Sequence, residues 1–319
     1  SLGNLYQPVS DGEARATLEA ALVAGLDYVD TAPHYGFGLS ERRVGDVLRG
    51  RDDYVLSTKV GRLLAPLPEH RGDAERSGFR TPMPFEPRFD YSYDAIMKSW
   101  EQSLQRLGLA RVDILYVHDI GRVTHGERHN ETFAQLTKGG GFRALEELRR
   151  GKEITAFGLG VNEWEICMDA MDHADLDLVL LAGRYTLLEQ EAITPFLARC
   201  IEGDVSVVIG GAFNSGILAT GTGGASTPYF NYEPAPQPIL DQVSRIEAIC
   251  DDYGVTLAAA ALQFPLAHPS VVSVIPGLGN VRRVQQTLDL YRELVPHDFW
   301  AALRQAGLLR PDVPAPAGT

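Results

Sequence analysis

Short hydrophobic runs alternate with amphipathic stretches along almost the whole chain. Seven runs are rich in Val, Ile, Leu and Tyr, residues that favour strands, and they cover 26–32, 54–61, 112–119, 156–162, 176–185, 205–213 and 271–278. The stretches between them have the apolar spacing of one helix face, and they cover 12–24, 40–49, 93–107, 141–150, 164–174, 191–202 and 238–253. Strands that alternate with helices predict βαβ units and a parallel sheet.

The number of strand–helix units favours an α/β fold of the closed (β/α)8 TIM-barrel type over an open sheet. Polar residues stand at the ends of four runs, where barrel enzymes carry their chemistry, namely Asp30, Lys59, His118 and Asn162. We therefore predict one barrel domain over residues 1–319. The eighth strand would have to precede Leu2. Either the first strand is missing from the sequence, which we favour, or residues 1–5 form a truncated one.

Three connections are long, and each follows a predicted strand. They span residues 62–92, 120–140 and 214–237. In a barrel they would overhang the C-terminal end of the strands, and long loops in a compact domain are usually functional or disordered. We expect them to shape the binding pocket.

Composition and charge exclude several classes of function. The net charge is −13 and the basic residues are scattered, so no cationic face is available for nucleic acid. No apolar run approaches the roughly 18 residues that a membrane span needs. Cys167, Cys200 and Cys250 lie far apart without metal-ligand spacing, so we predict reduced packing residues, no metal site and a cytoplasmic protein.

Three predicted strands each direct one ionisable group towards the same end of the barrel. Alternation along a strand places Asp30, Lys59 and His118 on the inner face. A buried carboxylate is costly without a partner, and Lys59 can supply one. Each residue alone has an ordinary explanation as a salt bridge or a core histidine. Their joint position at equivalent strand ends predicts a catalytic site.

Tyr35 lies just beyond the first predicted strand, where it could reach a ligand. A tyrosine pKa of about 10 is too high for a base near neutral pH. A nearby ammonium such as that of Lys59 favours the tyrosinate, while Asp30 holds the lysine in its charged form. His118 could hold and polarise a substrate oxygen. Positioned proton transfer of this kind accelerates a reaction by roughly 10²- to 10⁴-fold.

These motifs together resemble the catalytic tetrad of the aldo-keto reductases. The resemblance rests on Asp30-Thr31-Ala32 with Tyr35-Gly36, on Ser57-Thr58-Lys59 and on Val117-His118, in the family's order and approximate spacing. It extends from about Leu2 to the C-terminal tail. It implies a (β/α)8 barrel that binds an extended nicotinamide cofactor and transfers hydride to or from a carbonyl carbon. In this scheme Tyr35 is the general acid/base, Lys59 modulates its pKa, Asp30 pairs with Lys59, and His118 orients the substrate.

The resemblance also implies cofactor-binding residues, with departures from the family's pattern. Asn162 would hold the carboxamide, although Val161 replaces the serine that usually precedes it. Tyr185 would stack on the nicotinamide, although the glutamine expected three residues earlier is Ala182. The loop that wraps the pyrophosphate would contribute Phe213, Asn214, Ser215 and Gly216.

A second phosphate-binding segment is expected where a helix begins near Val281. Free backbone N–H groups at a helix N-terminus suit an anion, and the residues implied are Gly277, Gly279, Asn280 and Arg283. Family members selective for NADPH usually carry several cations on this loop, and here glycines occupy two of those positions. We therefore predict NAD as the cofactor, with NADP as the alternative.

Within the family, the chain most resembles the aldose 1-dehydrogenases and the similar pyridoxal 4-dehydrogenase. The segments that carry this resemblance are 3–6, 33–38 and 182–188. It implies oxidation of a cyclic hemiacetal, an aldose such as L-fucose, L-galactose or D-arabinose, to its lactone. The alternative is oxidation of pyridoxal to 4-pyridoxolactone. Tyr6, His34 and Trp164 are the residues predicted to contact the substrate ring.

Two other functions are compatible with parts of this pattern. A Schiff-base aldolase would use Lys59 as its nucleophile, but a partner carboxylate at Asp30 opposes this because an attacking lysine must lose its proton. A non-catalytic regulator would keep the cofactor site without turnover.

Overall fold

The computed structural model describes residues 2–69, 75–224 and 227–317. The chain divides into two compact units. The first comprises Ser1–Val161, Asp169–Asp177 and Gly277–Val284, and the second comprises Asn162–Met168, Leu178–Pro276 and Gln285–Thr319. Each predicted hydrophobic run contains a strand, so the expected alternation of strands and helices is confirmed. The extent of the predicted single domain stays a prediction.

The first unit is built on a parallel sheet whose inner face carries the predicted polar residues. Asp30 lies opposite Ser57 in the strand register, and Lys59 lies opposite Tyr116. The hydroxyls of Tyr28 and Tyr116 are 2.9 Å apart, which confirms that alternating residues share this face. The strands, in spatial order, are β1 (Tyr28–Asp30), β2 (Val55–Val60), β5 (Ile114–His118) and β6 (Ala156–Val161).

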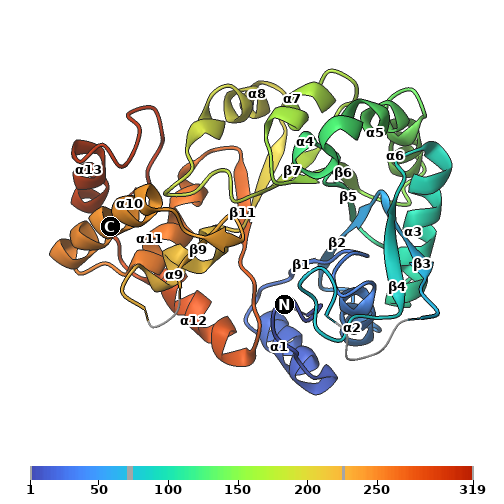
Figure 1. Ribbon diagram of the computed structural model, residues 1–319, viewed down its shortest axis with the longest axis horizontal. Helices are drawn as coiled ribbons and strands as arrows, with labels where there is room; N and C mark the ends of the chain where they lie inside the picture. The colour runs from blue at the N-terminus through green and yellow to red at the C-terminus, as the bar shows by residue number, and fades with distance from the viewer. Residues whose placement is uncertain (1, 70–74, 225–226, 318–319) are drawn as a thin grey trace. The chain divides into compact units, whose positions relative to one another are not determined.

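Helices cover the opposite side of this sheet, and consecutive ones pack against each other (Figure 1). The first of them begins with a capping box, in which the Ser10 side chain accepts from Glu13 N and the Glu13 side chain accepts from Ser10 N. The four helices that pack in sequence are α1 (Asp11–Val23), α2 (Leu39–Leu48), α3 (Tyr93–Leu107) and α6 (Gly141–Arg150).

A buried carboxylate joins two of these helices to β2. Glu41 on α2 is fully buried, and its oxygens accept hydrogen bonds from Thr58 Oγ1 on β2 (2.8 Å) and Arg106 Nε on α3 (2.5 Å). Nearby, Thr31 Oγ1 donates to Ser40 Oγ over 2.9 Å. Because a buried charge must be paired, these contacts fix α2 against the ends of β1 and β2.

The second unit has a three-stranded parallel sheet and an aromatic core. Phe264, Phe299 and Trp300 are completely buried, and the Phe299 and Trp300 ring centroids are 5.0 Å apart. The strands are β7 (Leu178–Ala182), β8 (Ser206–Gly210) and β11 (Val271–Ile275). The longer helices are α8 (Phe196–Glu202), α10 (Gln237–Tyr253), α11 (Leu257–Gln263) and α13 (His297–Gln305). Helices α7 (Glu165–Ala170) and α12 (Val281–Arg292) complete the order, each with residues in both units.

The three predicted long loops contain regular structure of their own. Parts of the first and third, residues 70–74 and 225–226, lie outside the described residues. Loop 62–92 forms an antiparallel hairpin of β3 (Arg62–Pro66) and β4 (Phe85–Phe89). Loop 120–140 contains α4 (Arg122–His125), a 3-10 turn (Gly126–Arg128) and α5 (His129–Leu136). Loop 214–237 contains α9 (Ile217–Thr220) and a hairpin of β9 (Tyr229–Phe230) and β10 (Glu233–Pro234).

Three further predictions concern residues 2–5, the three cysteines and membrane-spanning helices. Residues 2–5 add no strand to the parallel sheet, since Leu5 makes only an isolated antiparallel bridge with Phe79. A truncated barrel strand over these described residues is therefore wrong. Cys167, Cys200 and Cys250 are buried and unpaired, as predicted for packing residues. Among the described residues, no helix combines the length and apolar character that a bilayer span requires.

The contact between α2 and α3 depends on a glycine. A Cβ atom on Gly45 would lie 1.7 Å from the carbonyl oxygen of Leu107, so Gly45→Ala forces the two helices apart. Because overpacking typically costs about 1–3 kcal/mol, we expect the free energy of unfolding, measured in urea, to fall by about that amount.

Gly12→Ala is the matched control, because a Cβ there meets nothing within 4 Å. Gly12 lies in α1, where alanine is favoured over glycine by up to about 1 kcal/mol, so this variant should be at least as stable as the wild type. Equal stability of the two variants would show that the α2–α3 contact tolerates a side chain.

Candidate active site

The candidate site is centred on a buried ion pair between adjacent strands. Lys59 Nζ at the end of β2 lies 2.6 Å from Asp30 Oδ2 at the end of β1. The ammonium also donates to the carbonyl oxygen of Thr31 over 2.9 Å, and Ser57 Oγ donates to Asp30 Oδ1 over 2.6 Å. Lys59 is only 2% exposed, so this pair is held away from solvent.

The Lys59 side chain needs room that a neighbouring strand provides. A Cβ on Gly160 of β6 would lie 3.4 Å from Lys59 Cε and 3.2 Å from Tyr116 Cβ. Any larger residue at position 160 would therefore press on the lysine stem. The absence of a side chain there lets Lys59 extend along the inner face to Asp30.

Tyr35 lies beside the same ammonium. It follows β1 in a tight turn, in which Tyr35 N donates to Ala32 O and Ser40 N donates to Tyr35 O, both over 3.1 Å. Lys59 Nζ is 4.8 Å from the centre of the phenol ring, close enough for its charge to act on the Tyr35 hydroxyl. Tyr35 is half-buried, so the phenol stands at the edge of the site.

His118 completes the group at the end of β5. Its ring centroid is 6.0 Å from that of Tyr35, with the two planes perpendicular. Tyr91 Oη donates to the His118 carbonyl oxygen over 2.8 Å and fixes the backbone at this point. The structure thus brings together all four residues that the sequence singled out, Asp30, Tyr35, Lys59 and His118.

Opposing effects act on the pKa values of the pair that would handle a proton. Burial lowers the pKa of Lys59, but the charges of Asp30 and Tyr35 and the hydrogen bond to Asp30 raise it above its ordinary value. Burial raises the pKa of Tyr35, and the Lys59 ammonium only partly offsets this. The lysine is therefore a cation and the phenol is protonated at neutral pH. Lys59 lowers the pKa of Tyr35 as predicted, but burial raises it by more.

Both histidines at the site are neutral. Burial, followed by the charge of Arg62, lowers the pKa of His34 to about 3. The same two causes, with a smaller effect from Lys59, hold the pKa of His118 well below its usual value. A neutral imidazole can donate one hydrogen bond and accept another, which suits contact with a hydroxyl or a carbonyl oxygen.

Sequence reasoning missed a second buried ion pair in the same place. Arg62 Nη2, at the start of β3, donates to Asp119 Oδ2, and Asp119 immediately follows His118. Asp119 has a positive φ of 47°, which turns its side chain away from strand geometry. Their position along the sequence could have indicated a role, because Asp119 directly follows β5 and Arg62 lies two residues beyond β2.

The residues predicted to contact substrate fall in different parts of the molecule. His34 lies at the site, with its ring 6.0 Å from that of His118 and 5.3 Å from that of Phe79. Tyr6 is 57% exposed, and its N–H donates to Gly78 O in the loop that also carries Phe79. Trp164 belongs to the second unit and is half-buried just before α7.

Two predicted cofactor residues of the second unit make contacts within that unit, Asn162 through its backbone and Tyr185 through its ring. The carbonyl oxygen of Asn162 accepts a hydrogen bond from Arg184 Nε over 2.7 Å. Tyr185 is fully buried, and its ring packs against Phe264 (5.2 Å) and His268 (5.7 Å). Stacking of a nicotinamide on Tyr185 stays a prediction that this burial does not favour.

The predicted pyrophosphate loop is held in an unusual backbone shape. Asn214 and Ser215 both have positive φ values, 43° and 59°. Asn214 is buried, accepts from Thr186 Oγ1 over 2.5 Å and donates to Gly183 O over 3.2 Å. Its amide therefore fixes the loop, and cofactor contact by Phe213, Asn214, Ser215 and Gly216 stays a prediction.

The predicted segment before α12 fits an anion. Gly277 is exposed and a Cβ there would meet nothing within 4 Å. Asn280 Oδ1 accepts from Arg283 N over 2.9 Å and so caps the helix. Arg283 is exposed, which leaves its guanidinium available to a phosphate. Gly279 is half-buried between these residues.

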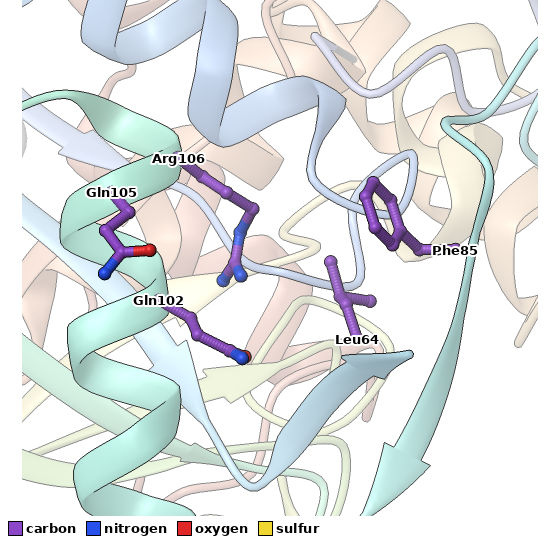
Figure 2. A pocket seen from close by; sticks show the side chains of 5 residues that line it. All are labelled: Leu64, Phe85, Gln102, Gln105 and Arg106. Atoms are coloured by element: carbon purple, nitrogen blue, oxygen red, sulfur yellow. The ribbon is translucent and has the colours of Figure 1, made fainter. Parts of the chain in front are cut away.

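A separate pocket of about 240 Å³ lies between α3 and the β3–β4 hairpin. Figure 2 shows Gln102, Gln105 and Arg106 of α3 on one side of it and Leu64 and Phe85 on the other. None of the residues that line it belongs to the predicted site. Its one cation, Arg106, is already paired with Glu41.

Comparison with known proteins places the chain in a family. A model described as "Aldo/keto reductase family" matches residues 1–307. Pyridoxal 4-dehydrogenase of Microbacterium luteolum is 47% identical over 318 residues, covering 97% of this chain and 92% of the relative. D-threo-aldose 1-dehydrogenase of a Pseudomonas species is 41% identical over 313 residues, with the same two coverages of 97% and 92%.

A solved structure shows the same fold. The holo form of an aldo-keto reductase from Bacillus halodurans is 22% identical and matches with a TM-score of 0.72, covering 97% of this chain and 90% of that one. The predicted (β/α)8 TIM-barrel class is thereby confirmed. The chain belongs to the aldo/keto reductase family and is an NAD(P)-dependent oxidoreductase.

Proposed function

We propose that this protein oxidises the hydroxyl of a cyclic hemiacetal to a lactone, with Tyr35 as the group that accepts the proton. The observation that carries this proposal is the buried Lys59–Asp30 pair, whose ammonium lies 4.8 Å from the centre of the Tyr35 phenol ring. The two relatives compared are named for pyridoxal and for D-threo-aldose. Both compounds form cyclic hemiacetals, so oxidation of that group is the chemistry common to them.

In this mechanism each residue has one task. Asp30 keeps Lys59 charged and in place, and the ammonium stabilises the Tyr35 phenolate, which becomes the neutral phenol when it takes the hydroxyl proton. His118, neutral and 6.0 Å from Tyr35 between ring centres, donates a hydrogen bond to the substrate oxygen. A bound nicotinamide supplies the hydride acceptor.

The cofactor would be held by the two predicted segments. Phe213, Ser215 and Gly216 lie before α9, and Gly277, Gly279, Asn280 and Arg283 lie around the start of α12; Ser215, Gly277, Asn280 and Arg283 are exposed. Between residues 275 and 284 the cations are Arg282 and Arg283. This low number supports NAD as the preferred cofactor, with NADP as the alternative.

Two competing functions receive less support. An aldolase needs Lys59 as a neutral nucleophile, and the raised pKa of Lys59 opposes that. It predicts that borohydride with a carbonyl substrate traps a covalent adduct at Lys59. A non-catalytic regulator would bind NAD or NADP without turnover. The grouping of Asp30, Tyr35, Lys59 and His118 at one site instead favours catalysis.

The direct test is an assay of purified protein with NAD and with NADP against L-fucose, L-galactose, D-arabinose and pyridoxal. We expect formation of reduced nicotinamide with at least one of them and a lactone as product, identified by mass spectrometry. The ratio of kcat/KM for the two cofactors tests the preference for NAD. Formation of an acid without a lactone intermediate would reject the hemiacetal as the reacting form.

Tyr35→Phe should abolish most turnover, because it removes the proton acceptor and leaves the pocket shape intact. We expect kcat to fall by about 10²- to 10⁴-fold, the usual contribution of positioned proton transfer. Cofactor affinity, measured by quenching of protein fluorescence, should not change. Tyr93→Phe is the control, since it removes a phenol that bonds only Glu147 on a helix surface. Full activity of Tyr35→Phe would reject the proposed role.

The oxidation rate should rise with pH. The pKa of Tyr35 is raised by burial, so the phenolate fraction increases about tenfold per pH unit through the neutral and mildly alkaline range. The pKa values of His34 and His118 are lowered, and that of Lys59 is raised, so these groups do not titrate there. We expect kcat/KM for oxidation to increase between about pH 7 and about pH 9. A decrease would indicate another base.

A further inference from the structure

Arg62 is a buried cation beside the site that the mechanism above does not use. It follows Lys59 by three residues in the sequence and is only 7% exposed. Its Nη2 donates to Asp119, next to His118. A buried ion pair adds little net stability, because removing two charges from water is costly. The position of Arg62 therefore needs a functional explanation.

Buried nitrogen atoms around Arg62 lack hydrogen-bond partners among the residues that the structure describes. They are Arg62 Nε, His34 Nδ1 and His118 Nδ1. The His34 and His118 rings are 6.0 Å apart, and after burial the charge of Arg62 is the next cause of the lowered pKa of each. The three atoms thus belong to one cluster. Unsatisfied buried polar atoms are rare, and each calls for an explanation such as a catalytic role, a water molecule or an ion.

The chemistry of these atoms limits what could satisfy them. The Nε–H of Arg62 can only donate, and its charge makes a hydrogen bond to an anionic oxygen about twice as strong as a neutral one. The surroundings are aromatic: the His34 ring lies 5.6 Å from that of Phe37 and 5.3 Å from that of Phe79, and the guanidinium carbon lies 4.9 Å from the Phe89 ring centre. Such walls suit a flat ring better than a chain of hydroxyls.

We propose that Arg62 determines substrate specificity by donating its free Nε–H to an ionised oxygen on an aromatic hemiacetal. In pyridoxal this oxygen is the phenolate on the ring carbon next to the one that bears the reacting group. Asp119 positions the guanidinium, and His34 and His118 bind the remaining oxygens of the substrate. This inference rests on the proposed hemiacetal oxidation and selects pyridoxal-like compounds over aldoses.

The test compares two substrates that differ in one group. Pyridoxal and 3-deoxypyridoxal share the pyridine ring and the cyclic hemiacetal, but the second lacks the phenol oxygen. We expect the wild type to have a kcat/KM about 10- to 100-fold higher for pyridoxal, the effect of one charge-assisted hydrogen bond. In Arg62→Gln this preference should shrink to less than about threefold. The ratio within one variant does not depend on how much of the protein is active.

Two further variants make the result decisive. Arg106→Gln breaks another arginine–carboxylate pair, between half-buried Arg106 and buried Glu41, away from the predicted site, and it should keep the wild-type preference. Arg62→Lys keeps a cation for Asp119 but has no Nε–H, so it should lose most of the preference and serves if Arg62→Gln does not fold.

The possible outcomes separate the two proposals. Equal rates of the wild type on both compounds, or an unchanged preference in the Arg62 variants, would overturn the role of Arg62 while leaving hemiacetal oxidation intact. A preference for L-fucose over pyridoxal that survives Arg62→Gln would likewise reject it. Absence of turnover on every hemiacetal would reject the proposed function, and the role of Arg62 would fall with it.

Discussion

Lys59 and Asp30 are neighbours only because two parallel strands end at the same level. The ammonium has three protons, of which Asp30 and the Thr31 carbonyl oxygen accept two, over 2.6 and 2.9 Å. The centre of the Tyr35 phenol ring lies 4.8 Å from the same nitrogen, so the ammonium charge acts on the phenol. A protonated lysine at this depth is stable only while Asp30 is ionised. The proton affinity of Tyr35 therefore depends on a carboxylate that it does not itself bind.

The part of this arrangement that depends on strand periodicity could be predicted from the sequence. The alternation of side chains along a strand places Asp30, Lys59 and His118 on one face, because side chains two residues apart point the same way. Strand ends in a parallel sheet meet at one edge, so the three groups had to lie close together. Tyr35 could be placed only approximately, since a turn positions it.

Other features depend on long-range contacts that a pattern does not contain. The sequence pattern predicts a loop where β3 and β4 form a hairpin, and it does not reveal the role of Arg62, because its partner Asp119 is 57 residues away. The loop motif does not reveal that the Asn214 amide bonds Thr186 and Gly183. Tyr185 has the expected sequence position, yet its burial is set by Phe264 and His268. In each case a tertiary contact decides what the side chain does.

Strand β2 carries polar anchors on both of its faces. On one face Ser57 and Lys59 bind Asp30, and on the other Thr58 donates to the fully buried Glu41. Sliding the strand by one residue would exchange its faces, turning Lys59 towards the helices and leaving Asp30 without a cation. A slip in either direction would separate Asp30 and Glu41 from their partners on β2, so the two carboxylates together fix the register of the strand. The position of the Lys59 amine is therefore fixed by the register of β2.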